Sequence, residues 1–174
     1  MTTLSAIADF NSLPPPDFNS IISLLFEPAP PLAKALYAAR PFDSYDHLLQ
    51  QTDAILHKLS PEDKLIVINA HPRIGEKKTN LSAMSLKEQG YTSATAQQPN
   101  EEDPQVMARL KELNNEYEAK YGFKFVVFVN GRSKKEIVPV MEQRLKDGKK
   151  EREMETGLRD MVSIARDRLG KHQR

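Results

Sequence analysis

The sequence predicts a single, largely helical domain, and three observations support this prediction. The chain has 174 residues, a length that fits one domain with a substantial hydrophobic core. Apolar residues recur at helical spacing over much of the chain, and 12 prolines divide it into short segments. The region that begins at Pro104 carries one long apolar stripe and ends at Gly122, which is typical of a long amphipathic helix.

Several short helical segments are expected before residue 71. Apolar residues at helical spacing mark them at Ile21, Leu24 and Leu25, at Leu32, Leu36 and Tyr37, and at Leu48, Leu49 and Ile55. Ser60 followed by Pro61 indicates the start of a further helix, because Ser is a good N-cap and Pro at the first turn has no N–H to leave unpaired. That helix should continue to Ala70.

The second half of the chain is expected to contain a loop and three more segments. The small and polar residues 90–103 predict a surface loop. Residues 123–129 favour a buried strand by their β-branched and aromatic content, although so short an apolar run does not separate strand from helix. Ser133 and Glu136 form a capping-box pattern at the start of a helix, and residues 154–169 predict a last one.

Composition excludes several classes of function. A net charge of +1 gives no electrostatic case for nucleic acid or a membrane surface. The absence of cysteine removes thiolate nucleophiles and cysteine-bound zinc and suits a reducing compartment, and His47 and His57 have no partner at metal-ligand spacing. The N-terminus does not resemble a signal peptide, and the last residues do not form a peroxisomal signal. We therefore expect no metal site, and a protein of the cytoplasm or the peroxisome.

The most informative motif is His71-Pro72-Arg73-Ile74-Gly75, which follows an apolar helical run. Proline disfavours helical geometry in the residue before it, so His71 should lie at a rigid helix end. Imidazole can accept and return a proton near neutral pH, which suits an acid or base. A histidine at a helix C-terminus also interacts favourably with the helix dipole, so a purely structural role stays open.

Ser85-x-x-Glu88-Gln89 also has two interpretations. Ser at an N-cap with Glu three residues later is the capping box, a structural pattern. The N-terminus of a helix also attracts anions, so a substrate anion could dock there while Glu88 and Gln89 supply hydrogen bonds. The two interpretations are compatible.

Arg168 lies where a surface charge is not expected. At about 100° per residue, the apolar positions of residues 158–169 span an arc of roughly 160°, and Arg168 falls inside it. It must find an anionic partner or extend along the helix to water, and both alternatives stay open. The basic run 144–150, by contrast, is interrupted by an acidic residue and predicts a solvated turn.

With these motifs the chain resembles the 2-oxo-4-hydroxy-4-carboxy-5-ureidoimidazoline (OHCU) decarboxylases, which form allantoin at the end of the route from urate. The resemblance extends over nearly all of the chain. Its further elements are Phe10-Asn11, Ala39-Arg40-Pro41-Phe42, Leu113-Asn114-x-x-Tyr117, Tyr121-Gly122-Phe123-x-Phe125-Val126, Gly131-Arg132-Ser133 and Arg168-Leu169.

The resemblance implies an all-α, single-domain multi-helix bundle of the OHCU decarboxylase type over residues 1–174, commonly a homodimer without metal or organic cofactor. It also implies that residues 125–129 are helical or near-helical, and this expectation replaces the strand. The implied catalytic residues are His71, Glu88 and Arg168. The implied substrate-binding positions are Pro72, Ser85, Gln89, Phe125, Val126, Val127, Phe128 and Val129.

The implied reaction is a cofactor-independent decarboxylation of the small molecule OHCU to (S)-allantoin. His71, oriented with Glu88, would move the proton of the substrate hydroxyl, and fixed donors would stabilise the charge that develops as CO2 leaves. Two alternatives remain: a related enzyme for another ureido-imidazoline, and a non-catalytic helical interaction module on the same scaffold.

Overall fold

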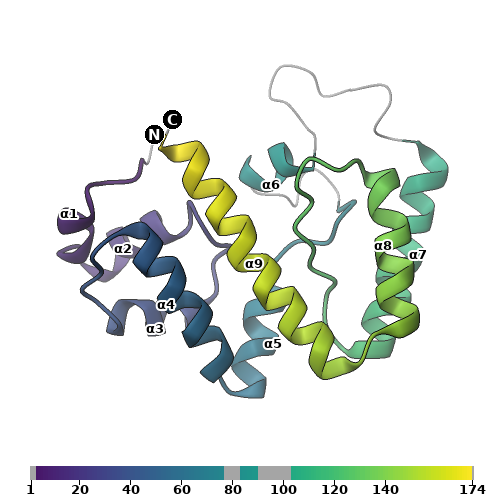
Figure 1. Cartoon of the computed structure of the whole chain (residues 1–174), viewed down its shortest axis with the longest axis horizontal. Coiled ribbons are helices and arrows are strands. Elements are labelled where there is room, and N and C mark those ends of the chain that lie inside the picture. The colour runs from purple at the N-terminus through teal and green to yellow at the C-terminus, as the bar shows by residue number, and fades with distance from the viewer. Residues whose placement is uncertain (1–2, 77–82, 90–102, 174) are drawn as a thin grey trace. The chain divides into compact units, whose positions relative to one another are not determined.

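The computed structural model describes residues 3–76, 83–89 and 103–173, and the regular secondary structure of these residues is entirely helical (Figure 1). The predicted all-α class is therefore confirmed. The helices are α1 (Ile7–Asn11), α2 (Pro15–Ile22), α3 (Pro30–Ala38), α4 (Tyr45–Lys58), α5 (Pro61–Asn69), α6 (Ala83–Glu88), α7 (Pro104–Tyr121), α8 (Lys134–Asp147) and α9 (Lys150–His172). Within this part of the chain, no helix is both long and apolar enough to cross a bilayer.

The chain forms two compact units. One boundary between them follows Ala70, and the other lies within the last helix. The first unit contains Met1–Ala70 and Leu158–Arg174, and the second contains His71–Gly157. In the first unit α3 packs against α2, α4 and α5. In the second unit α7 packs against α8, and Figure 1 shows these two helices side by side.

The core of the first unit is built from apolar side chains that recur at helical spacing. Phe10 stacks on Phe18, with ring centroids 4.6 Å apart, and both side chains are fully buried. The apolar arc predicted on the last helix is buried as well: Leu158, Met161, Val162, Ile164, Ala165 and Leu169. Burial of such stripes, rather than helix propensity alone, stabilises these short helices.

Two short motifs far apart in the sequence are joined directly in the first unit. The side-chain amide of Asn11 donates to the carbonyl of Phe42 at 2.8 Å and accepts from its N–H at 2.9 Å. Arg40 donates to the carbonyl of Asn11 at 2.8 Å, and its guanidinium lies 3.5 Å from the centre of the Tyr37 ring. These contacts fix the end of α1 against the chain between α3 and α4.

The helix boundaries with strong local signals are confirmed. Ser60 accepts from the N–H of Asp63 as the N-cap of α5, and Ser133 forms a complete capping box with Glu136 at the start of α8. Gly122 ends α7 in the left-handed conformation with φ of 83°. The last helix was predicted over residues 154–169 and is longer at both ends.

The prediction for residues 125–129 is wrong. Residues 124–129 form neither the helix implied by the family resemblance nor the strand favoured by composition; they have no regular secondary structure. Phe125, Val126 and Val127 are consecutive and all buried, which accounts for the apolar run, but the described residues contain no neighbouring strand with which it could pair. The predicted surface loop at 90–103 lies outside the described residues except for Asp103, the N-cap of α7.

Asn11→Ala should lower the free energy of unfolding by about 1–2 kcal/mol, because it leaves both polar backbone groups of Phe42 without their partner. Urea denaturation followed by circular dichroism measures this loss. Ser12→Ala is the matched control, since the exposed Ser12 hydroxyl bonds only within its own turn. Equal stability of the two variants would contradict the role of Asn11.

Candidate active site

The motif that contains His71 forms a turn directly after α5. The helix ends at Asn69 with Ala70 as its C-cap, and His71 is the first residue of the second unit. Gly75 closes the turn with φ of 76°, a conformation that residues with a Cβ rarely adopt. The helix-end position predicted for the half-buried His71 is therefore confirmed.

Helix α7 holds this turn through two side chains. Asn114 donates to the carbonyl of Ile74 at 3.0 Å in a buried position. Arg73 makes a two-pronged ion pair with Glu118, with N–O distances of 2.8 and 3.1 Å. Hydrogen bonding to Glu118 raises the pKa of the Arg73 guanidinium above its ordinary value, so Arg73 stays charged. The backbone that follows His71 is thus fixed from the α7 side.

Gln89 holds the same turn from another side. Its amide oxygen accepts from the N–H of Gly75 at 3.0 Å, and its amide nitrogen donates to the carbonyl of Arg73 at 3.3 Å. Sequence resemblance implied that Gln89 binds substrate, whereas both polar atoms of its amide bond the turn. Gln89 therefore joins the His71 turn to the end of α6.

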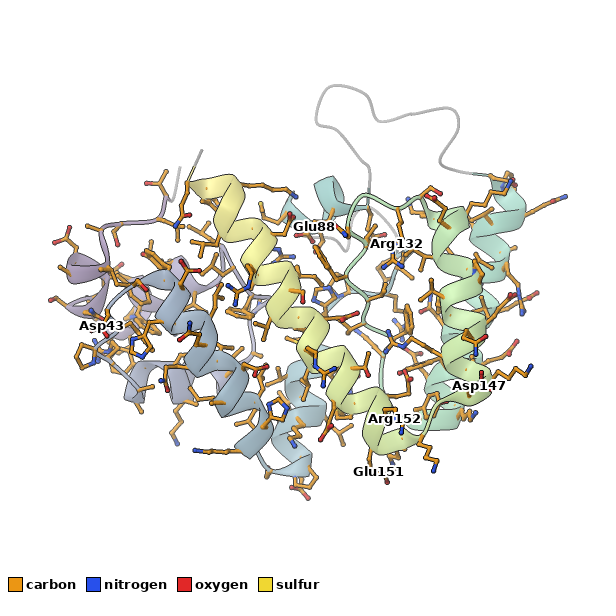
Figure 2. All side chains as sticks on the ribbon, in the orientation of Figure 1. Asp43, Glu88, Arg132, Asp147, Glu151 and Arg152 are labelled. Atoms are coloured by element: carbon orange, nitrogen blue, oxygen red, sulfur yellow. The ribbon has the colours of Figure 1, made fainter. Side chains whose placement is uncertain are left out.

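The capping-box interpretation of Ser85 and Glu88 is wrong. Helix α6 begins at Ala83, so Ser85 is its third residue and is buried at 2% exposure rather than capping the helix. Glu88 is the last residue of α6 (Figure 2), and Gln89 follows it. The idea that these two residues assist an anion at the helix N-terminus is also wrong, because they lie at the opposite end.

Two arginines bind the carbonyls of the irregular segment 124–129. Arg144 donates to the carbonyl of Val126 at 3.0 Å. Arg132, in the turn before α8 (Figure 2), donates to the carbonyls of Val129 and Phe128 at 2.9 and 2.7 Å. These bonds hold the backbone that the resemblance assigned to substrate binding.

A buried charged network supports Arg144. Its Nε donates to Glu153 Oε2 at 2.8 Å, and Tyr117 donates its hydroxyl to the same oxygen at 2.7 Å. Glu153 is 4% exposed, although Glu151 and Arg152 beside it project outward from the start of α9 (Figure 2). Burial, followed by the bond to Glu153, raises the pKa of Tyr117 above its ordinary value.

Sequence reasoning missed this network. Arg144 was interpreted as part of a solvated turn, which is wrong, because it lies in α8 with 14% of its side chain exposed. The position of Glu153 in the last helix could have indicated a buried charge. At about 100° per residue, Glu153 lies roughly 20° from Ile164, within the apolar face that also contains Arg168.

Arg168 lies in the first unit, whereas His71, Ser85, Glu88, Gln89 and residues 125–129 lie in the second. Its side chain is 1% exposed, so the alternative in which it reaches water is wrong. It donates to Glu27 at 3.2 Å and to the carbonyl of Leu25 at 3.3 Å. The anionic partner that its position requires is therefore Glu27, which also lines a cavity of about 410 Å³ in the first unit.

The described residues contain no group of three or more His, Asp or Glu side chains that could hold a metal ion. The candidate site residues of the second unit lie in three segments: His71 and Pro72 in the turn, Ser85, Glu88 and Gln89 at α6, and residues 125–129. Hydrogen bonds from Gln89 to Gly75 and Arg73 join the first two of these segments. The titratable side chains among these residues are the imidazole of His71 and the carboxylate of Glu88, two kinds of group that serve in proton transfer.

Known structures share this fold. A crystal structure of OHCU decarboxylase in the presence of (S)-allantoin has a TM-score of 0.61 and 23% identity, covering 80% of this chain and 88% of that chain. A crystal structure of (S)-allantoin synthase has a TM-score of 0.65 and 22% identity, covering 97% of this chain and 54% of that chain. At these identities the likeness shows the fold.

The family profile described as OHCU decarboxylase matches residues 11–170, so the chain belongs to the OHCU decarboxylase family. It is 29% identical over 169 residues to the 2-oxo-4-hydroxy-4-carboxy-5-ureidoimidazoline decarboxylase of Halalkalicoccus jeotgali, covering 97% of this chain and 92% of that protein. It is 30% identical over 161 residues to the uric acid degradation bifunctional protein PucL of Bacillus subtilis. That match covers 92% of this chain but 31% of PucL, so the chain spans about a third of the bifunctional relative.

Tyr117→Phe should destabilise the protein at neutral pH and do so less at alkaline pH. The unfolded chain ionises Tyr117 near pH 10, whereas the raised pKa keeps it protonated when folded. Its stabilising contribution is therefore complete below about pH 10 and declines as pH rises further. Denaturation at a series of pH values measures the difference between wild type and variant; a difference that grows above about pH 10 would contradict the buried tyrosine–carboxylate bond.

Proposed function

We propose that this protein decarboxylates OHCU to (S)-allantoin in urate degradation, without a cofactor. Its family and the names of its relatives support this activity. The observation that carries the proposal is the turn that contains His71. Side chains of Asn114, Glu118 and Gln89 form hydrogen bonds with the three residues that directly follow Pro72 in this turn. An imidazole on a backbone held in this way suits directed proton transfer.

The proposed chemistry divides between two kinds of group. His71, oriented with Glu88, takes the proton of the substrate hydroxyl. The bond to the carboxyl carbon then breaks, CO2 leaves, and its electron pair remains on the ring carbon and spreads into the adjacent conjugated system. The hydroxyl oxygen becomes the ring carbonyl, and a proton delivered to one face of the neighbouring, ureido-bearing carbon sets the (S) configuration of allantoin.

Backbone N–H groups of residues 125–129 are proposed to stabilise the developing negative charge. The carbonyls of Val126, Phe128 and Val129 accept from Arg144 and Arg132, which supports this role because the segment's peptide planes are held by bonds on their oxygen side. Pro72 and Ser85 are proposed as further substrate-lining positions. Arg168 is proposed to bind a substrate oxygen, with Glu27 fixing the orientation of its guanidinium.

We further propose a homodimer as the working form and a location in the cytoplasm or the peroxisome. The absence of cysteine is consistent with a reducing compartment. We also propose that residues 1–174 act as one domain made of the two compact units, since the family match extends through both.

The activity is tested by following freshly oxidised and hydrolysed urate optically, with and without protein. The protein should accelerate loss of the intermediate's absorbance and give (S)-allantoin rather than the racemate. A panel of related ureido-imidazolines in the same assay separates OHCU from another substrate. No acceleration with any of them, together with racemic product, would favour the non-catalytic interaction module instead.

His71→Ala should reduce turnover by on the order of 100- to 10,000-fold, the usual contribution of a general acid or base. The fold should persist, because the half-buried His71 adds little to the core. His57→Ala is the matched control, since His57 is exposed on α4 and bonds its own helix. Stopped-flow kinetics and circular dichroism measure both; near-normal turnover in His71→Ala would remove the catalytic role.

Arg168→Lys should raise KM by roughly 10-fold, because lysine keeps the charge but loses the planar fork. Arg166→Lys is the control on the same helix, since Arg166 is 55% exposed and pairs with Asp46 at the surface. Steady-state kinetics with thermal unfolding separates binding from stability. If Arg168→Lys lowered stability and left KM unchanged, Arg168 would serve only the ion pair with Glu27.

A further inference from the structure

Lys134 is a buried cation in the second unit that no proposed catalytic step uses. It is the first residue of α8 and 6% exposed, and its ammonium donates to the backbone carbonyl of Gln89 at 3.1 Å. Lys135, the next residue, is exposed. Burying an ammonium group costs free energy unless the group is hydrogen-bonded, and the first residue of a helix does not need to be buried or charged. The bond to the Gln89 carbonyl is thus one that compensates the buried charge of Lys134.

The residue that Lys134 bonds lies at a junction of the candidate site. Gln89 directly follows Glu88 and bonds the backbone of Arg73 and Gly75 through its side-chain amide. Lys134 and Gln89 together therefore join three segments: the turn that begins at His71, the end of α6, and the start of α8. Each segment comes from a different part of the sequence.

Helix α6 depends on such contacts for its position. It has six residues, and isolated helices shorter than about 12 residues are marginal in water. The place of Glu88 relative to the His71 turn therefore depends on the bonds made by its neighbour. The carbonyl of Gln89 is at the end of α6, where backbone carbonyls have no partner further along the helix.

We propose that Lys134 is a positioning residue for Glu88. It holds the end of α6 through the Gln89 carbonyl, so that the carboxylate stays in line with the His71 turn during proton transfer. This inference rests on the proposed decarboxylase activity. Because a displacement of about 1 Å can cost on the order of 100-fold in rate, loss of the bond acts on turnover more than on substrate affinity.

The test compares Lys134→Met with Lys134→Arg and with Lys135→Met in the decarboxylation assay. Lys134→Met keeps the length of the side chain without its charge or donor and should lower kcat by about 10- to 100-fold, with KM changed less than about 3-fold. Lys134→Arg should recover most of the loss because it can donate to the same carbonyl, and Lys135→Met should match wild type. The (S) excess of the allantoin should fall only in Lys134→Met.

Hydrogen exchange supplies a readout that does not depend on turnover. Backbone amides of residues 83–89 should exchange faster in Lys134→Met than in Lys135→Met, while those of α7 remain unchanged. Unchanged kcat, product chirality and exchange in Lys134→Met would overturn the inference and leave the proposed function standing. If Lys134→Met failed to fold, Lys134→Gln, whose donor ends one bond short of the lysine ammonium, would have to show a kcat loss that Lys134→Arg does not. A wild-type protein with no activity on OHCU would overturn both proposals.

Discussion

The second unit depends on one constraint: backbone groups buried outside a helix must find hydrogen-bond partners in side chains. Helices satisfy most of their own polar groups, but the turn at residues 71–75 and the segment 124–129 do not. Asn114 and Gln89 supply the partners for the turn, and Arg144 and Arg132 supply them for the segment. Unpaired, each such buried group would cost about 1–3 kcal/mol.

This constraint explains why polar residues occur at buried positions of otherwise amphipathic helices. Asn114 is 4% exposed on α7 because its amide must reach the carbonyl of Ile74. Arg144 is buried beside Glu153, which balances its charge, and Tyr117 donates a second hydrogen bond to the same carboxylate oxygen. The network thus supports irregular backbone, namely the segment 124–129, which contains candidate substrate-binding positions.

The need to satisfy buried backbone groups also separates the residues of the family pattern into two sets, those that support the backbone and those proposed to carry out the chemistry. Asn11, Arg40 and Phe42 bond one another in the first unit, and Asn114 and Tyr117 bond supporting groups in the second. These motif residues fix backbone rather than offer proton chemistry. Gln89 joins them, since its amide bonds the turn, and its assignment to substrate binding by resemblance alone remains a prediction. The proposed chemistry therefore needs far fewer residues than the pattern contains.

The sequence predicts features whose cause is local and misses those whose cause is distant. Ser60, Gly122 and Ser133 mark helix ends correctly because a cap is decided within a few residues. Ser85 fits the same capping pattern and is misread, because it lies inside α6 as the third residue of the helix. The segment 124–129 is misread twice, because carbonyls of its irregular backbone accept from the distant Arg144 and from Arg132 instead of from a neighbouring strand.

The partners of buried charges were the hardest feature to predict, and the two buried ion pairs that residues of α9 make with other helices or loops show why. Arg168 and Glu153 both fall within the apolar face of this helix, which signals that each needs a partner, but nothing local identifies Glu27 or Arg144. Replacing a buried pair by apolar residues is often neutral for stability, so stability alone does not account for Arg168 and Glu27. What the pair provides is a guanidinium with one orientation, because Glu27 and the carbonyl of Leu25 fix two of its nitrogens. A planar group fixed in this way can distinguish a correctly placed oxygen from a misplaced one, which a flexible ammonium cannot do.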